Sequence, residues 1–173
     1  MHALTFWKRV TMDETDFLSE LIQLLNAEGI LYAVVGGQAV NAYVDPLVSL
    51  DLDLVVATQD LERVELLLRK HFRVERFPHS LHASQPGSNL RAQVQTDPRY
   101  AAFVQRASPQ EVLGLMLPVA DVRDVLRGKI WAAQDTTRRP SKRQKDLADI
   151  ARLLERYPDL RSSVPQDILE RLI

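Results

Sequence analysis

The sequence contains no cysteine, few aromatic residues and no long apolar run. The absence of cysteine excludes a disulfide framework, a thiolate zinc site and a cysteine nucleophile. Aromatic residues make up 6% of the chain, which argues against a stacking platform for single-stranded nucleic acid. No window approaches about 18 consecutive apolar residues, so we expect no membrane-spanning helix. The first nine residues lack the apolar stretch of a secretory signal, and we therefore expect a cytoplasmic protein without a membrane partner.

Size and charge predict one folded domain without naming its partner. The chain has 173 residues, 46% of them apolar, which is enough for a buried core. Its 22 Lys and Arg residues nearly balance 23 Asp and Glu residues, giving a net charge of −1. Bulk charge therefore favours neither a nucleic acid nor an acidic surface as the partner.

The hydrophobic pattern predicts an α+β fold, a small mixed sheet with a C-terminal helical layer. An apolar stripe over residues 18–25 is typical of a helix that starts near Thr11 or Asp13 and ends at Glu28-Gly29. Strand patterns follow at residues 31–35, 50–56, 72–77, 89–96 and 112–117. Helical patterns cover residues 38–43, 58–68, about 120–134, 141–156 and 165–173. We expect residues 78–88 to form a loop, and residues 1–118 (the core) and 119–173 (the helical layer) to pack as one compact domain.

A glycine pair separates the first predicted strand from a short helix. Gly36 and Gly37 follow the apolar residues 31–35, and Gln38 begins the helical pattern. Glycines at such a junction allow the backbone to approach a ligand closely, and the start of a helix offers unpaired N–H groups to an anion such as phosphate. The alternative is a tight turn that simply needs glycine.

Two acidic residues begin the second predicted strand. Asp51 and Asp53 are two residues apart, so their side chains point to the same face of the strand, about 6.6 Å apart along it. Two carboxylates held in this way repel each other unless a cation neutralises them, and Mg²⁺ is the usual partner when phosphates complete the site. An exposed strand face is the alternative, but residues 54–56 continue the strand as an apolar one.

Basic residues cluster in the C-terminal helices. Five Lys or Arg residues and no acidic residue occupy positions 138–145, and Asp146 and Asp149 follow them. Such a cluster can bind polyphosphate or an RNA backbone, or it can be a solvated helix face. Lys129 differs because apolar residues follow it, so we expect it at the edge of a packed face.

These three signals, in this order, resemble the nucleotidyltransferase superfamily that includes DNA polymerase β. The similarity is strongest to its bacterial abortive-infection and toxin-like branch. It spans residues 31–154 and rests on Val35-Gly36-Gly37, Asp51-Leu52-Asp53, Lys129 and residues 138–149. The resemblance implies transfer of a nucleoside monophosphate from a nucleoside triphosphate to a hydroxyl of an unknown acceptor, tRNA or protein. The toxin-like branch also implies a cognate antitoxin.

The resemblance assigns a role to each signature residue. Asp51 and Asp53 would hold Mg²⁺, or Mn²⁺, and Lys129 would offset charge on the leaving pyrophosphate. The expected nucleotide contacts are Gly36, Gly37, Gln38, Gln93, Lys145 and Asp146. Positioning and charge neutralisation account for most of the catalysis of phosphoryl-type transfer, which agrees with this set.

The sequence departs from the family pattern before Asp51, where relatives carry a basic residue and a threonine and this chain has Leu47, Val48 and Ser49, and again on a later strand. Relatives carry a third carboxylate on a later strand, whereas the polar face of residues 90–96 offers Gln93 and Gln95. Glutamine cannot accept a proton, and we expect the nearby Asp97 to cap the turn before Pro98. A weak or inactive module that binds nucleotide or RNA is therefore the alternative to an enzyme. A basic RNA-binding adaptor that uses residues 138–145 is a third possibility.

The histidine pair at His79 and His82 lies in the predicted loop, with no acidic residue nearby. Two histidines need further convergent ligands to hold a metal ion. We therefore expect these two to be solvated loop residues.

Overall fold

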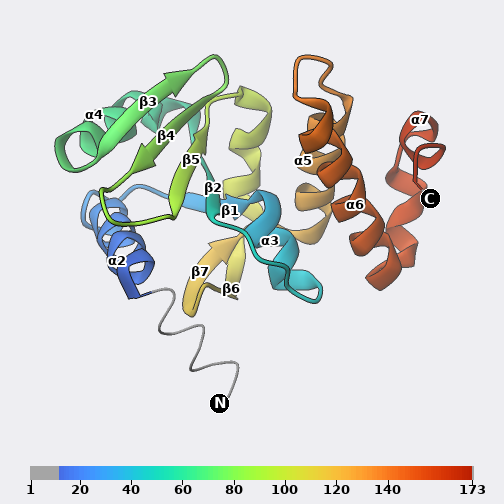
Figure 1. Ribbon diagram of the computed structural model, residues 1–173, viewed down its shortest axis with the longest axis horizontal. Coiled ribbons are helices and arrows are strands. Elements are labelled where there is room, and N and C mark those ends of the chain that lie inside the picture. The colour runs from blue at the N-terminus through green and yellow to red at the C-terminus, as the bar shows by residue number, and fades with distance from the viewer. Residues whose placement is uncertain (1–11, 173) are drawn as a thin grey trace.

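A mixed sheet forms the centre of the computed structural model, which describes residues 12–172 (Figure 1). Within these residues the sheet has seven strands in the order β3-β4-β5-β2-β1-β7-β6. The strands are β1 (Tyr32–Val35), β2 (Asp51–Val56), β3 (Arg73–Phe77), β4 (Ser80–Ser84), β5 (Arg91–Gln95), β6 (Ser108–Val112) and β7 (Leu115–Val119). The predicted mixed sheet is confirmed. Thr11 and the first nine residues lie outside the described part of the chain.

Helices precede and follow the strands along the chain. The α-helices are α2 (Met12–Ala27), α3 (Gly36–Tyr43), α4 (Leu61–His71), α5 (Val122–Gln134), α6 (Pro140–Arg156) and α7 (Gln166–Leu169). Within residues 12–172 there are also three 3₁₀ segments, η1 (Thr58–Asp60), η2 (Pro98–Arg106) and η3 (Pro158–Ser163). None of the helices within residues 12–172 has the length and apolar character of a membrane span.

Strand β2 lies in the middle of the sheet and brings its acidic end to one face. It pairs antiparallel with β1, where Val35 is opposite Asp53, and parallel with β5, where Gln93 is opposite Asp53. Leu52 and Leu54 alternate with the acids and are fully buried. Since neighbouring side chains on a strand point to opposite faces, the apolar residues fix which way the two acids point.

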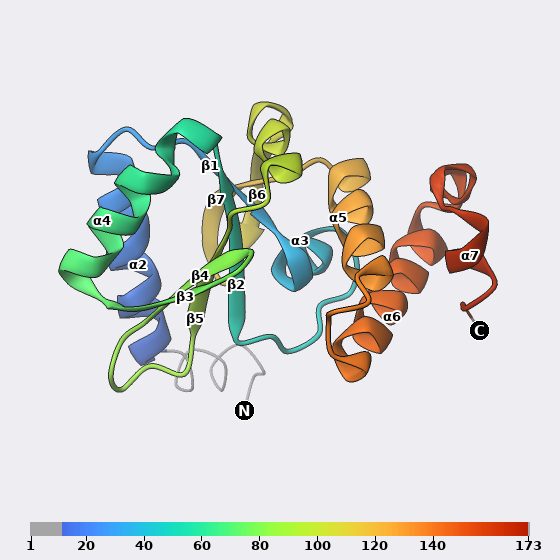
Figure 2. The same cartoon turned by 90° about the horizontal axis from the view of Figure 1, so that it is seen from above.

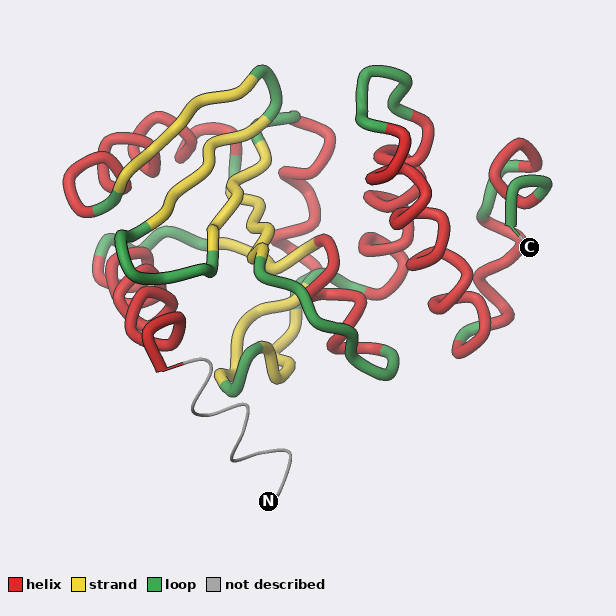
Figure 3. Tube along the Cα trace, viewed as in Figure 1, coloured by secondary structure: helices red, strands yellow, loops and turns green. Residues whose placement is uncertain are grey.

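The two faces of the sheet are covered by different helices (Figure 2). Helices α2 and α4 lie on one face, where their apolar stripes are buried, including Phe17, Leu21 and Leu68. Helices α3, α5 and α6 lie on the other side. The C-terminal helices α5 and α6 pack side by side, and Ile130, Leu147 and other apolar residues are buried there (Figure 3). The predicted helical layer is confirmed, and the space between it and the sheet is where the site lies.

Two predicted elements were wrong. Residues 78–88 do not form a loop throughout, because β4 lies within them and pairs with both β3 and β5. Its alternation of Leu81 and Ala83 with polar residues was obscured by the flanking prolines and glycine. The predicted strand over residues 112–117 is interrupted, because Val112 ends β6, Leu113 and Gly114 form the hairpin turn, and residues 115–117 belong to β7. Leu113 and Gly114 take positive φ values of 50° and 83° there, as a two-residue hairpin turn requires.

Candidate functional site

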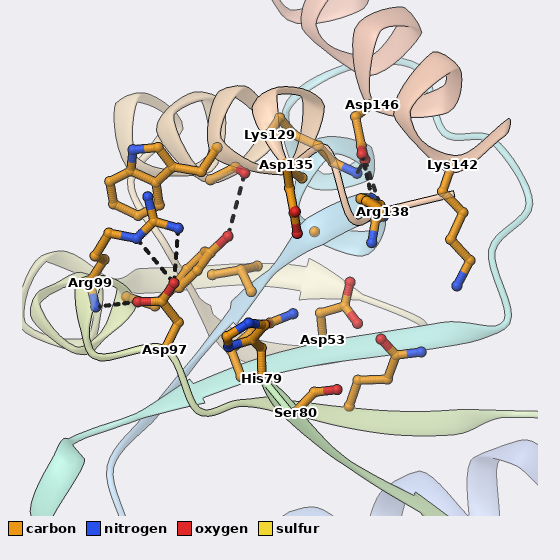
Figure 4. Close-up of a pocket in the computed structure, with 18 of the residues that line it drawn as sticks. Asp53, His79, Ser80, Asp97, Arg99, Lys129, Asp135, Arg138, Lys142 and Asp146 are labelled. Carbon is orange, nitrogen blue, oxygen red and sulfur yellow. Dashed lines mark hydrogen bonds and ion pairs between the residues drawn. The ribbon is translucent and has the colours of Figure 1, made fainter. Parts of the chain in front are cut away.

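A cleft of about 940 Å³ lies between the open face of the sheet and the α5–α6 pair (Figure 4). Asp53 and Gln93 contribute to its sheet side, together with Ser80 and His82 from β4. Residues of α5, of α6 and of the loop between them form the opposite wall. The cleft therefore brings together residues that are up to about a hundred positions apart in the sequence.

Gly36 and Asp53 meet at the floor of this cleft, whereas Asp51 does not line it. Gly36 has a φ of 70°, a left-handed conformation that favours glycine. A Cβ atom at this position would lie 2.0 Å from Oδ2 of Asp53, so the missing side chain makes room for the carboxylate. The antiparallel pairing of Val35 with Asp53 fixes this approach. The structure thus brings together one residue of the glycine pair, Gly36, and one of the acidic pair, Asp53.

The carboxyl of Asp53 is held where ionisation is unfavourable. Its Oδ1 atom is buried and has no hydrogen-bond partner. Burial raises the pKa of Asp53 to about 6, and repulsion from Asp51 adds to the rise, whereas Lys129 and Arg138 oppose it. A buried carboxylate oxygen without a partner is costly in a folded protein. A bound cation would supply the missing partner.

Asp51 points to the same side but is already paired. Its Oδ1 atom lies 3.1 Å from Nη2 of Arg91, which sits directly opposite on the parallel strand β5. The Asp51 side chain is 36% exposed, more open than that of Asp53. Sequence analysis missed Arg91, because its position depends on the register between two strands that are 40 residues apart.

Gln93 lies directly opposite Asp53 on β5 and lines the cleft. It therefore occupies the place on the later strand where relatives are expected to carry a third carboxylate. An amide at this place can donate to or accept from a ligand, but it brings no negative charge and no base.

Gly37 and Gln38 lie beside the cleft and do not line it. Gln38 is 5% exposed and donates from Nε2 to the carbonyl of Ser49 over 2.7 Å. A Cβ atom at Gly37 would come within 3.5 Å of Oγ of Ser49. Both residues pack the segment that leads into β2, so both contact the loop that comes before Asp51.

Lys129 lies on α5 at the wall of the cleft, where its ammonium group meets two acids of α6. Its Nζ atom is 3.1 Å from Asp146 and 2.9 Å from Asp149. Burial alone would lower the pKa of Lys129, but these two carboxylates, together with Asp53, raise it. Lys129 is therefore a fixed cation near the floor of the cleft.

Asp146 is 1% exposed and also accepts from Nε of Arg138 over 2.8 Å. These contacts pair both buried acids of α6 with basic residues. Arg138 and Lys142 line the cleft across from Asp53, as Figure 4 shows. Lys145 is exposed and does not line it. One helical turn separates Lys142 from Lys145, and only the former faces the sheet.

The far end of the cleft combines a guanidinium group with aromatic rings. Arg99 donates from Nε and Nη2 to Asp97 and lies over the ring of Trp131, 4.5 Å from its centroid. The ring of Tyr100 meets Trp131 edge-on at 5.1 Å. Asp97 also accepts from the backbone N–H of Arg99, which confirms its predicted role as the cap of η2.

The donors present fit one hard divalent cation better than a closed metal cage. Within residues 12–172, no group of three or more His, Cys, Asp or Glu side chains is placed to hold a metal ion. Asp53 offers a buried oxygen without a partner, and Asp51 lies two residues away on the same face. Mg²⁺ is commonly bound by one or two carboxylates, with waters and substrate phosphates as its other ligands. The two acids fit that pattern.

Ser80 and His82 are cleft residues that sequence analysis placed in a solvated loop. Both belong to β4, and Oγ of Ser80 lies 3.0 Å from Nε2 of His82. The signal that could have found them is the alternation of polar and apolar residues over positions 80–84.

Comparison with solved structures gives proteins of the same fold. The antibiotic-resistance factor ANT(2'')-Ia matches with a TM-score of 0.59 and 13% identity, over 93% of this chain and 89% of that chain. The lincosamide antibiotic adenylyltransferase LnuA, bound to lincomycin, matches with a TM-score of 0.53 and 11% identity, over 79% of this chain and 95% of that chain. An antigenic nucleotidyltransferase-like protein from Paracoccidioides brasiliensis matches with a TM-score of 0.52 and 22% identity, over 81% of this chain and 74% of that chain. At these identities the likeness shows the fold alone.

Comparison with curated proteins gives no match. Comparison with family models gives one whose description is "Nucleotidyl transferase AbiEii toxin, Type IV TA system", and it matches residues 21–172. The matched segment contains the glycine pair, both strand acids, Lys129 and the acids of α6. The resemblance found in the sequence is thereby confirmed, and the chain belongs to the nucleotidyl transferase AbiEii toxin family of Type IV toxin–antitoxin systems.

Proposed function

We propose that this protein transfers a nucleoside monophosphate from a nucleoside triphosphate to an acceptor hydroxyl, with Mg²⁺ or Mn²⁺ bound at Asp51 and Asp53. The observation that carries the proposal is the carboxyl of Asp53. Its Oδ1 atom is buried without a partner, and its Oδ2 atom occupies the space left by the missing side chain of Gly36. A site that holds a carboxylate in this way gains most from a cation and an anionic ligand that arrive together.

The cation would neutralise the phosphate oxygens and orient the triphosphate, which is the chemistry that a divalent metal supplies in such sites. The chain's own residues hold the reacting groups around it. Gly36 leaves room for the carboxylate of Asp53, and Gln93 offers an amide beside Asp53. Attack by the acceptor oxygen on the α-phosphorus forms the new O–P bond, and pyrophosphate leaves with the bonding electron pair.

The wall opposite Asp53 supplies positive charge for the leaving pyrophosphate. Lys129 is fixed between two carboxylates, so it contributes a preorganised field that needs no rearrangement during the reaction. Arg138 and Lys142 also line the cleft, and Lys142 is exposed and free to reach a phosphate. Preorganised cations of this kind favour the state in which negative charge has moved to the leaving group.

We propose a macromolecular acceptor, with tRNA or a protein side chain as the two classes to test. The basic residues Arg138, Arg139 and Lys142 line one side of the cleft, and such residues would contact an RNA backbone. The family description names a toxin–antitoxin system, so we also propose that a cognate antitoxin opposes the activity in the cell.

Label transfer from α-³²P nucleoside triphosphates tests the proposal. We would incubate the protein with each of the four triphosphates, Mg²⁺ or Mn²⁺ and a cell extract, and then follow label in RNA and in protein. Asp53→Asn and Asp51→Asn should each abolish transfer. Asp159→Asn, at an exposed position in η3, is the matched control and should transfer normally. No transfer by the wild-type protein to either class of acceptor would contradict the proposal.

A nucleotide-binding module without transfer activity is the second candidate. The observations that favour it are Gln93 in the place of a carboxylate and the pairing of Asp51 with Arg91. This candidate predicts metal-dependent nucleotide binding by calorimetry, with no label transfer in Mg²⁺ or in Mn²⁺. Label transfer by the wild-type protein therefore separates the two candidates.

A further inference from the structure

The proposed transfer reaction needs a group that accepts the proton of the attacking hydroxyl. Asp51 and Asp53 are committed to the cation in the proposed site, and the amide of Gln93 cannot accept a proton. Lys129 is held in its charged form by Asp146 and Asp149. The acceptor of the proton must therefore be another residue of the cleft.

His82 stands in the same row of the sheet as Asp53 and Gln93. It pairs with Gln93 across β4 and β5, and Gln93 pairs with Asp53 across β5 and β2. Directly opposed residues share a face of the sheet, and all three line the cleft. With neighbouring strands about 4.8 Å apart, the Cα atoms of His82 and Asp53 are separated by roughly 10 Å. His82 and Asp53 therefore lie on either side of Gln93 on the face of the sheet that lines the cleft.

The ring of His82 is fixed by its neighbours. Oγ of Ser80, which also lines the cleft, lies 3.0 Å from Nε2 of His82, within hydrogen-bond distance. The ring of Phe77 packs against the imidazole at a centroid distance of 4.2 Å. A ring held on two sides can receive a proton without first reorienting.

The charges around His82 favour its neutral form. Burial lowers the pKa of the imidazole and the guanidinium of Arg91 on β5 lowers it further, as does Lys142 on α6. Asp51 on β2 and Glu75 on β3 oppose this effect. The net shift is downward, so the ring is neutral at pH 7 and able to accept a proton.

We propose that the Ser80–His82 pair is the proton acceptor of the transfer reaction, which deepens the proposed function and rests on it. The acceptor oxygen forms its bond to the α-phosphorus and gives its proton to Oγ of Ser80. Ser80 passes its own proton to Nε2 of His82, and the O–P bond to pyrophosphate breaks. The imidazolium then releases the proton to solvent, so no oxidant, reductant or further reactant is needed.

Other titratable groups in the cleft are less suited to this role. Asp97 accepts two hydrogen bonds from the side chain of Arg99, and its pKa lies below the ordinary value because of these bonds. Asp135 accepts from both the N–H and the hydroxyl of Thr137, and its pKa is lowered by them. His79 lies at the turn between β3 and β4, outside the row formed by Asp53 and Gln93.

The test is the pH profile of kcat for label transfer in wild type, His82→Gln and Ser80→Ala. With Mg²⁺ at a saturating concentration, which keeps Asp53 ionised, we expect His82→Gln to lower kcat by about 100-fold or more and to remove the acidic limb of the profile, because the base is lost. We also expect an unchanged KM for the triphosphate and an unchanged Mn²⁺ affinity by calorimetry. Imidazole added to His82→Gly should restore part of the rate, which a purely structural role would not allow. His71→Gln, at an exposed position on α4, is the control.

Three results would overturn the proposal. One is a His82→Gln protein that keeps the wild-type kcat and acidic limb while Asp53→Asn is inactive, and this result leaves the proposed function intact. Another is loss of the limb in His79→Gln instead. The third is label on Ser80 itself in peptides analysed by mass spectrometry, which would make Ser80 the nucleotide acceptor. Absence of transfer by the wild-type protein would overturn both proposals.

Discussion

The carboxyl of Asp53 destabilises the folded protein whenever it is ionised without a cation. Burial and the neighbouring Asp51 raise its pKa to about 6, well above the ordinary value of 3.8. The folded state therefore binds a proton more tightly than the unfolded state does. Since stability falls with pH wherever the folded state holds more protons, Asp53 lowers the free energy of unfolding as pH rises from about 4 to 6.

Asp53→Asn should therefore stabilise the metal-free protein at alkaline pH. Above pH 7 the gain in the free energy of unfolding should be on the order of 3 kcal/mol, which follows from the size of the pKa shift. At pH 5 roughly half of the gain should remain. Urea unfolding at pH 8 and at pH 5, in the presence of a chelator, measures both values. Asp51→Asn, at an exposed and paired position, is the matched control, and an equal gain in both variants would contradict the explanation.

Gly36→Ala should disrupt the site, whereas Gly37→Ala should preserve the fold. Alanine at position 36 places a Cβ atom 2.0 Å from Oδ2 of Asp53 and must adopt a φ of 70°, which costs about 1–2 kcal/mol before the clash is counted. At position 37 the nearest atom is 3.5 Å away. Thermal unfolding and Mn²⁺ calorimetry would show the contrast. Unchanged Mn²⁺ affinity in a folded Gly36→Ala protein would contradict the close approach of these two residues.

Helices α5 and α6 are joined by a network of buried charges as well as by apolar packing. Lys129 lies between Asp146 and Asp149, and each acid has a second basic partner, Arg138 or Arg152. Arg152 also donates to the carbonyl of Asp45, so the network extends to the segment that follows α3. The wall of the cleft is thereby tied to the segment that precedes β2.

Lys129→Met should destabilise the protein by about 3 kcal/mol, because two buried carboxylates lose their shared partner. Lys145→Met, on the exposed side of the same helix pair, should change the free energy of unfolding by less than about 0.5 kcal/mol. Urea unfolding monitored by circular dichroism compares the two. A loss below about 1 kcal/mol for Lys129→Met would show that the ion pairs contribute little to the packing of α5 on α6.

The elements that follow from local sequence were predictable, and those that depend on distant pairing were not. Gly36 and Asp53 could be predicted to meet because each terminates or begins a strand with a clear apolar pattern. The contact of Arg91 with Asp51 needs the register of β5 on β2, and the place of His82 needs the register of β4 on β5. The burial of Lys129 could be predicted from its apolar neighbours, but its pairing with two acids on the next helix could not.

At the scale of the whole molecule, the cleft is built from two parts of the chain that meet only after folding. The sheet contributes Asp53 and Gln93, and α5, α6 and the loop between them contribute the cations. A triphosphate bound with its cation would contact both parts at once. Binding should therefore stabilise the molecule as a unit and link the sheet to the helical layer.

A thermal shift with Mn²⁺ and a non-hydrolysable nucleoside triphosphate should detect this link. At a ligand concentration 100 times Kd the gain is about 2.7 kcal/mol, or roughly 5–10 °C in Tm for a chain of this size. Neither ligand alone should give the full shift, since the phosphates and the cation complete each other's site. The same additions should leave Asp53→Asn unshifted. An equal shift in that variant would mean that the nucleotide binds elsewhere.

The position of Mn²⁺ in crystals grown with a non-hydrolysable triphosphate tests the site most directly. Anomalous scattering should place the ion within ligand distance of Oδ1 of Asp53 and of the Asp51 carboxylate, with the triphosphate running toward Arg138 and Lys142. An ion bound away from both acids, or a triphosphate that leaves the cleft empty, would contradict the proposed site.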